Sequence, residues 1–300
     1  STRFDYEYWL RGEIRRNAAI FGHEDIADRL PVDLREELSA ERSVRPPRVQ
    51  SQLEPPAAIT DLTIRVLGPV EIFRDPSVQF AADAWTTRRA RDIFCYIATS
   101  KNRRVLKDVL IDAFWRDEDF ETVEKNFHPT ISHIRKALNS RQPFKQNFLM
   151  FRDGAYQLNP VLSYAIDTEE FERWIVEAEK AKREKDVDRQ RASLESAHKI
   201  YRGDFMSGVY EDWADERRQF YSEQAARVIA ALAKLSLSEK QWADALRYAG
   251  EALAGDPFRE DMHRLTMKAF AAQGKPASVK KHFEKMKKNL ASDNDNKLDG

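Results

Sequence analysis

KNFHPTISHIRKAL, residues 125–138, decides how the middle of this 300-residue chain folds. Its large apolar residues recur at steps of four, three and four, the spacing of one face of an α-helix: Phe127, Ile131, Ile134 and Leu138. Pro129 lies inside this pattern, although a proline in a helix interior removes a backbone hydrogen bond and costs roughly 3 kcal/mol. A helix starting at Pro129 would lose Phe127. The sequence therefore predicts a helix that begins near Thr122 or Val123 and carries Pro129 inside it.

Short strands and two further helices are predicted around this helix. LTIRVLGPVEIF, residues 62–73, has two apolar runs flanking a Gly-Pro pair, which indicates two strands joined by a turn. Helical patterns follow over residues 87–98 and 106–114. An Asp-Gly pair within residues 148–158 is a strong hairpin signal. Strands, three helices and a hairpin, in that order, predict a winged helix-turn-helix whose N-terminal strands form a platform.

The polar face of the predicted helix suits DNA recognition. At 100° per residue, six side chains point away from the apolar face: Lys125, Asn126, Pro129, Ser132, His133 and Lys136. Lys, Asn, Ser and His can hydrogen-bond base edges in a major groove, each good bidentate pair discriminating by ~1–3 kcal/mol, and the Pro129 ring could meet a thymine methyl. His128 and Arg135 flank this face and suit phosphates. An amphipathic helix with a solvated side is the alternative, but three helices followed by a wing favour DNA.

Basic residues are locally in excess here, although Lys+Arg and Asp+Glu balance at 50 each over the whole chain. Residues 86–158 hold fourteen basic and nine acidic residues, and phosphate neutralisation by Lys and Arg supplies most non-specific affinity for DNA. Arg152, beside the hairpin turn, is placed to reach a minor groove or its phosphates. The N-terminus of the first helix also suits a phosphate, although ordinary capping and solvated arginines explain its residues equally well: Thr86, Thr87, Arg88 and Arg89.

The rest of the sequence divides the chain into further segments. Residues 1–38 are predicted to be helical and are interpreted as the end of an upstream sensor region, and residues 39–60 as a Pro-rich linker. A winged-helix DNA-binding domain over 61–160 is followed by a tetratricopeptide-like domain over 166–290 and a frayed polar tail over 291–300. Two helical hairpins match at an offset of 34, the tetratricopeptide period, which aligns Lys240 with Gly274. The predicted fold class is mainly α with a small β component.

Other classes of function are disfavoured. Cys95 lies in an apolar run, so it is interpreted as a buried side chain rather than a reactive thiol. Neither a signal peptide nor ~18 consecutive apolar residues occur, so a cytoplasmic protein without membrane contact is expected. His198, His263 and His282 lie singly in helical patterns, and the two histidines of the predicted recognition helix are too far around it to share a metal. With no phosphate-binding glycine loop, the sequence predicts no enzyme, metal or cofactor.

The order of these motifs resembles SARP-type bacterial transcriptional regulators over about residues 62–290. The segments TTRRARDIFCYIA, NFHPTISHIRKAL and FRDGAYQL are similar to their winged helix, and GDPFREDMHRLTMKAFAAQGKPASVKKHFEKM to their bacterial transcriptional activator domain. The resemblance makes the helix ending at residue 138 the recognition helix and residues 148–158 the wing. It implies binding to repeated promoter sites, as a homodimer or side-by-side protomers, and contact with RNA polymerase. Pro129 departs from many relatives, which carry a helix-compatible apolar residue there.

Two functions are open at this point. The leading hypothesis is a sequence-specific transcriptional activator that binds double-stranded promoter DNA through its winged helix and touches RNA polymerase through its helical domain. The alternative is a protein-interaction scaffold, in which the helical repeats bind a partner and the winged helix is a docking module.

Overall fold

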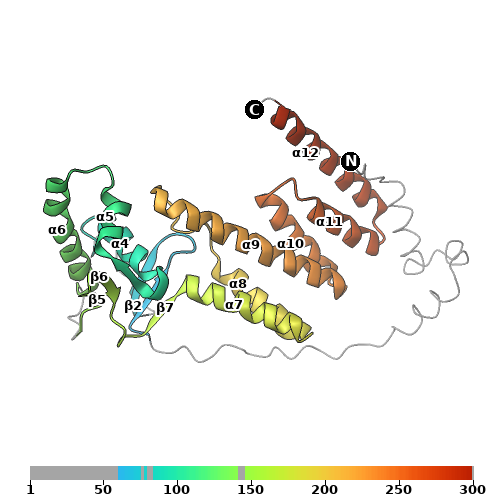
Figure 1. Ribbon diagram of the computed structural model, residues 1–300. Coiled ribbons are helices and arrows are strands. Elements are labelled where there is room, and N and C mark those ends of the chain that lie inside the picture. Colours follow the sequence, from blue (N-terminus) through green and yellow to red (C-terminus); the bar gives the residue numbers. More distant parts are fainter. Residues whose placement is uncertain (1–59, 76–77, 80–83, 141–145, 299–300) are drawn as a thin grey trace, which may run out of the picture. The chain divides into compact units, whose positions relative to one another are not determined.

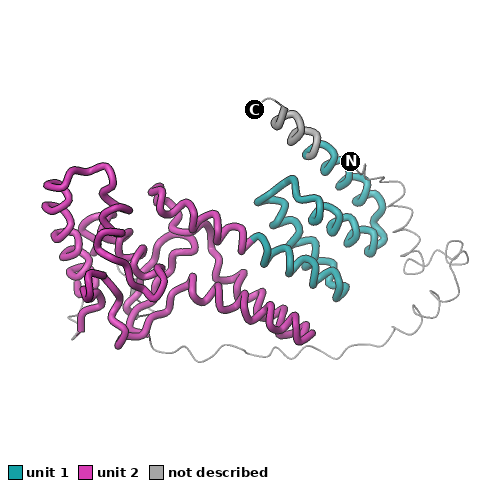
Figure 2. The backbone as a smooth tube through the Cα atoms, in the orientation of Figure 1, with its two compact units in different colours: residues 1–53, 226–300 teal, residues 54–225 magenta. Residues whose placement is uncertain are grey.

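The computed structural model describes residues 60–75, 78–79, 84–140 and 146–298. The helices expected within residues 1–38 and nearly all of the linker expected over 39–60 lie outside the described residues. The described chain divides into two compact units within helix α9 (Asp212–Ser238) (Figure 2). The first unit in chain order ends at Ala225 and is drawn in magenta, as unit 2, whereas the second begins at Ala226 and is drawn in teal, as unit 1.

The first unit opens on a four-stranded sheet with the strand order β3-β2-β1-β7 (Figure 1). β1 (Leu62–Arg65) pairs antiparallel with β2 (Glu71–Asp75) and parallel with β7 (Tyr164–Ile166), and β3 (Val78–Gln79) pairs with β2. The two predicted strands of this sheet are confirmed. β3 and β7 were not predicted because segments of two or three residues are too short to show an alternating pattern.

Three helices follow in the predicted order: α4 (Arg88–Ala98), α5 (Lys107–Trp115) and α6 (Phe120–Leu138). Thr87 caps α4 as predicted, because its side chain accepts a hydrogen bond from the backbone N–H of Ala90 at 3.2 Å. α5 starts and ends one residue later than expected, with Leu106 at its N-cap position.

The wing belongs to a second sheet with the strand order β4-β6-β5. β5 (Leu149–Arg152) and β6 (Ala155–Leu158) form the predicted hairpin, whose turn residues Asp153 and Gly154 have φ of 49° and 72°. Two positive φ values are typical of the type I′ turns that suit tight hairpins. β4 (Arg104–Leu106) pairs with β6 and was not predicted.

Helix α6 contains Pro129, as predicted, but begins earlier than Thr122 or Val123. The cause is Asp119, whose carboxylate accepts hydrogen bonds from the backbone N–H and the hydroxyl of Thr122, both at 2.9 Å. The apolar face is buried as the periodicity predicts, by Val123, Phe127, Thr130, Ile131, Ile134, Ala137 and Leu138.

The first unit continues into helices α7 (Asp167–Arg183), α8 (Val187–Ile200) and the first part of α9, and the loop before α9 pairs with the end of β1. Arg202 donates its backbone N–H to the Leu67 carbonyl, and Gly68 donates to the Asp204 carbonyl, both at 3.1 Å. Gly68 has φ of 125°, and a Cβ there would lie 3.2 Å from Cβ of Arg202. This close approach requires glycine.

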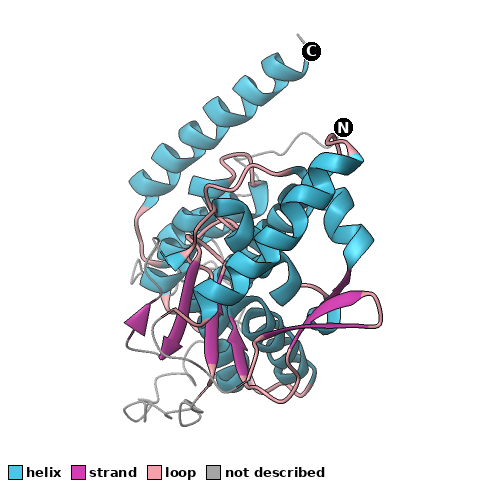
Figure 3. Cartoon of the chain, turned by 90° about the vertical axis from the view of Figure 1, so that its left-hand side faces the viewer, coloured by secondary structure: helices cyan, strands magenta, loops and turns pink. Residues whose placement is uncertain are grey.

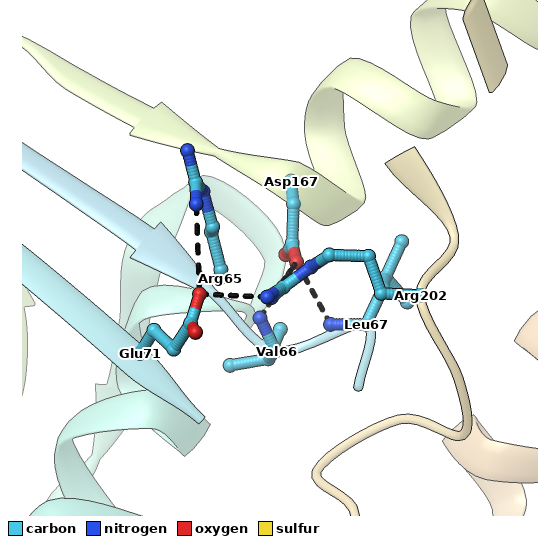
Figure 4. A network of polar contacts seen from close by, with 6 residues as sticks. All are labelled: Arg65, Val66, Leu67, Glu71, Asp167 and Arg202. Atoms are coloured by element: carbon cyan, nitrogen blue, oxygen red, sulfur yellow. Dashed lines mark hydrogen bonds and ion pairs between the residues drawn. The ribbon is translucent and has the colours of Figure 1, made fainter. Parts of the chain in front are cut away.

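A buried carboxylate fixes the same junction (Figure 4). Oδ2 of Asp167, the first residue of α7, accepts the backbone N–H groups of Val66 at 2.7 Å and Leu67 at 2.8 Å. Arg202 lies beside it, with 4.0 Å between Nη2 and Oδ2, and pairs with Glu71 at 2.6 Å. Burial raises the pKa of Asp167 to about 6, despite the two backbone donors.

Aromatic rings pack α9 against the winged helix. Trp213 lies with its ring centroid 4.9 Å from that of Tyr96 on α4 and 5.4 Å from that of Phe114 on α5. The Arg217 guanidinium stacks over Tyr96 at 5.1 Å and donates hydrogen bonds to the hydroxyls of Thr99 and Ser100. Burial lowers the pKa of Arg217. The winged helix and the start of α9 are therefore packed within one unit.

The second unit contains the end of α9 and helices α10 (Trp242–Gly255), α11 (Glu260–Ala272) and α12 (Pro276–Leu298). α11 packs against both α10 and α12. Lys240 and Gly274, the pair aligned by the 34-residue offset, have φ of 61° and 69°, and each is followed by a backbone N–H that bonds a carbonyl five residues back. Both are Schellman-type helix ends, so the aligned turns share one geometry.

The C-terminal residues continue the last helix. The expectation that the tail is frayed from residue 291 was wrong as far as Leu298, because α12 extends to that residue.

Two histidines expected to lie singly are paired. His263 Nδ1 lies 2.9 Å from His282 Nε2, and His263 Nε2 lies 2.9 Å from the Pro257 carbonyl. A carbonyl can only accept, so Nε2 of His263 donates to Pro257 and, in a neutral ring, Nδ1 accepts from His282. Burial, His263 and Lys285 lower the pKa of His282 to about 4. The pair ties α12 to α11.

Three observations bear on the class of function: the burial of Cys95, the search for metal sites and the search for membrane-spanning helices. Cys95 is buried as predicted, and burial raises the pKa of its thiol. Within the described ranges, no group of three or more His, Cys, Asp or Glu could hold a metal ion. None of the helices in the described part of the chain has both the length and the apolar character needed to cross a membrane.

Candidate nucleic-acid interface

One face of α6 is exposed along most of the helix. Figure 3 views the chain from the side on which Figure 1 draws α6. Seven of the eight side chains predicted to read or contact DNA are exposed: Lys125, Asn126, His128, Pro129, Ser132, Arg135 and Lys136. His133 is only half-buried, and its Nδ1 is buried without a hydrogen-bond partner among the described residues. The expectation that His133 points freely away from the apolar face is therefore only partly met.

The opposite face of α6 fixes the helix against its own domain. Phe127 is fully buried, with its ring centroid 5.5 Å from that of Trp115 on α5 and 5.7 Å from that of Tyr156 on β6. Lys107 Nζ lies 5.2 Å from the centre of the Phe127 ring, within cation–π range. α6 therefore rests on both α5 and the strand that carries the wing, which holds the exposed face rigidly.

Pro129 lies in the middle of the exposed face. Proline has no backbone N–H, so the carbonyl of Lys125 one turn earlier lacks its usual helical partner. The next carbonyl along the helix, that of Asn126, accepts the hydroxyl of Thr130 at 2.7 Å. A threonine hydroxyl that bonds the carbonyl four residues back often bends a helix, so this bond lies where the proline also favours a bend.

The basic residues on the exposed face of α6 have no acidic partner in the described part of the chain. Among the described residues, Lys125, Arg135 and Lys136 form no ion pair. Several acidic residues that precede or begin the helix form ion pairs with other basic side chains. These pairs are Arg89–Glu118 at 2.9 Å, Arg116–Asp112 at 3.2 Å and Lys107–Glu124 at 3.6 Å. The exposed face therefore presents three cations to solvent.

The wing carries one predicted and one unpredicted basic residue. The side chain of Arg152 is 73% exposed and pairs with Asp153 at 3.4 Å. Arg104, on β4, is exposed and donates to the Asp153 carbonyl at 3.3 Å. Sequence patterns missed Arg104 because the three-residue β4 was not predicted. Its position beside the wing turn depends on pairing with β6.

The N-terminus of α4 lies next to the turn before α6. Thr86, Thr87, Arg88 and Arg89 are all exposed, and Thr87 serves as the helix cap. Arg89 pairs with Glu118 at 2.9 Å and stacks over Trp115 at 5.2 Å. Its guanidinium is therefore engaged within the domain, which favours the structural interpretation of this residue.

Comparisons with known proteins give consistent results. The family described as "Bacterial transcriptional activator domain" matches residues 166–295. The regulatory protein AfsR of Streptomyces coelicolor is 25% identical over 238 residues, which cover 78% of this chain and 23% of AfsR. The chain thus spans about a quarter of the length of this relative.

A solved structure has the same fold. The chain matches Mycobacterium tuberculosis EmbR in complex with a low affinity phosphopeptide, with a TM-score of 0.65, 17% identity and coverage of 78% of this chain and 61% of EmbR. The winged helix, the match to the activator domain and these two similarities support the resemblance to SARP-type bacterial transcriptional regulators.

Proposed function

We propose that this chain is a transcriptional activator that binds specific promoter sequences by inserting α6 into the major groove. The observation that carries the proposal is the exposed face of α6, which combines three cations without ion-pair partners in the described chain with hydrogen-bonding side chains. A rigid helix with such a face fits a groove that displays donors and acceptors along its floor. Lys125, Asn126 and Lys136 would contact base edges.

The remaining exposed residues would position the helix. His128, Arg135 and Arg152 are placed to contact phosphates, which fix register but carry no sequence information. Ser132 is exposed on the same face and would also meet the groove, whereas His133 is half-buried and would reach it less freely. Arg88 is exposed beside the N-terminus of α4, where free backbone N–H groups favour a phosphate.

The helical domain is proposed to contact RNA polymerase and to bring protomers side by side on repeated sites. The name of the matched family, an activator domain, supports a role in activation. A scaffold that binds only a protein partner is the competing function, and DNA binding separates the two.

Changing Lys125, Asn126 and Lys136 together to alanine is expected to weaken binding to promoter DNA by at least about 100-fold, because each base contact contributes about 1–3 kcal/mol. A mobility-shift titration at fixed salt measures the change. The matched control replaces three exposed basic residues of α7, Lys180, Lys182 and Arg183, and should bind like the wild type. Equal affinity of the α6 variant and the wild type would contradict the assignment of α6.

Pro129→Ala is expected to raise the free energy of unfolding by about 1–3 kcal/mol, because alanine restores the hydrogen bond to the Lys125 carbonyl. The variant should also change the preference among promoter sequences, because the apolar ring is lost from the groove-facing surface. Urea unfolding and competition among duplexes with thymine substitutions measure the two effects. A more stable variant with unchanged preference would show that the proline is only tolerated.

A further inference from the structure

The outer surface of α12, in the second unit, is rich in lysine. Between Val279 and Asn289 its exposed basic residues are Lys280, Lys281, Lys285, Lys287 and Lys288, against the single acid Glu284. Val279 and Met286 hold the opposite face of the helix in a core with Met267 of α11. At 100° per residue Lys281, Lys285 and Lys288 therefore occupy the side of α12 opposite this core, and Lys280 and Lys287 lie on its flank.

Several other basic side chains of the second unit have acidic partners. The distances between the charged atoms are 3.3 Å for Lys234 with Asp261, 3.3 Å for Arg247 with Asp244 and 2.6 Å for Arg264 with Glu260. Within the described residues none of the five lysines of α12 forms an ion pair. Lys281 and Lys285 lie one turn apart, and like charges at that spacing destabilise a helix. Folding alone therefore does not favour this arrangement.

The chemistry of the face fits a nucleic-acid backbone better than a protein. No large apolar side chain is exposed in the part of α12 whose side chains are described. Protein interfaces depend on buried aromatic and apolar anchors and are depleted in lysine, whereas lysine is a common phosphate ligand. Lys281 and Lys288 are separated by about 10 Å along the helix at 1.5 Å per residue. Over that length of the duplex axis one DNA strand carries roughly three phosphates, one for each 3.4 Å of axis.

We propose that the lysine face of α12 binds the phosphate backbone of duplex DNA, as a second, sequence-independent contact. The proposal rests on the proposed function, because it concerns the same DNA ligand. Such a contact strengthens binding to all sequences alike and leaves discrimination to α6.

The test replaces Lys281, Lys285 and Lys288 with glutamine in the full chain, which removes three charges at nearly equal helix propensity. The control replaces Lys180, Lys182 and Lys185, which are exposed at the end of α7 and just beyond it. Fluorescence anisotropy with a mixed-sequence duplex is measured over a series of salt concentrations. The α12 variant should lower the salt slope by about 2–3, since each phosphate contact contributes about 0.9, and the control should match the wild type.

The outcomes separate this inference from the proposed function. Salt slopes that are equal for the wild type and the α12 variant overturn the inference, while wild-type binding to the duplex still supports DNA binding by α6. A wild type that does not bind the duplex overturns both. A variant that keeps the wild-type slope for DNA but loses binding to poly-glutamate shows that the face recognises acidic protein segments, which also overturns the inference.

Discussion

Replacing Phe127 with alanine is expected to lower the free energy of unfolding of the first unit by about 3–5 kcal/mol, the usual cost of truncating a buried phenylalanine. Phe127 is fully buried, and its ring packs against Trp115 and Tyr156. These neighbours belong to α5 and β6, so a collapsing cavity would shift three elements at once. The variant should consequently also bind DNA more weakly, since α6 loses its support.

Phe120 on the same helix is the matched control. Its side chain is 80% exposed, so Phe120→Ala should change the free energy of unfolding by no more than about 0.5 kcal/mol, as is usual for surface substitutions. Urea titration followed by tryptophan fluorescence measures both variants, and Trp115 reports directly on the Phe127 site. Equal effects of the two substitutions would contradict the placement of the apolar face of α6.

The apolar face of α6 could be predicted from the sequence because its period is visible along the helix. The start of the helix could not, because Phe120 breaks the pattern by lying exposed and the start is fixed by the cap of Asp119. The exposed side chains of α6 could likewise be placed on one face. Half-burial of His133 depends on what packs beside the helix, and no spacing within α6 reveals that.

Features that depend on distant partners escaped prediction. The Asp167 carboxylate bonds backbone groups 100 and 101 positions earlier, and His263 meets a histidine 19 positions later. β4 has three residues, and its partner β6 comes after α5 and α6 in the sequence. In each case the contact is created by the packing of whole elements, so residue type and local spacing carry no signal for it.

Asp167→Ala is expected to lower the free energy of unfolding of the first unit by about 2–5 kcal/mol at neutral pH, because it leaves two buried N–H groups unpaired at about 1–3 kcal/mol each. Those groups belong to Val66 and Leu67, which directly follow β1. The matched control is Glu169→Ala in the same first turn of α7. Glu169 is exposed and pairs with Arg103 at 2.7 Å, and such a pair contributes about 0–1 kcal/mol.

Asp167→Asn separates the shape of this side chain from its charge. Burial raises the pKa of Asp167 to about 6, compared with an ordinary value of 3.8. The folded state therefore binds this proton more tightly than the unfolded state. The resulting stabilisation is fully present below pH 3.8 and is lost as the pH rises through about 6. Oδ1 is buried without a hydrogen-bond partner in the described structure, so it is the oxygen available to carry the proton.

The free energy of unfolding of wild type and Asp167→Asn should therefore be compared by urea titration at several pH values between 4 and 7. The advantage of the wild type over the variant is expected to shrink as the pH rises across this range, because only the wild type loses a proton in the folded state. Glu169→Gln, at the exposed site, should leave the pH profile almost unchanged. Parallel profiles for the wild type and Asp167→Asn would mean that Asp167 is ionised throughout, and that its two backbone donors and Arg202 outweigh its burial.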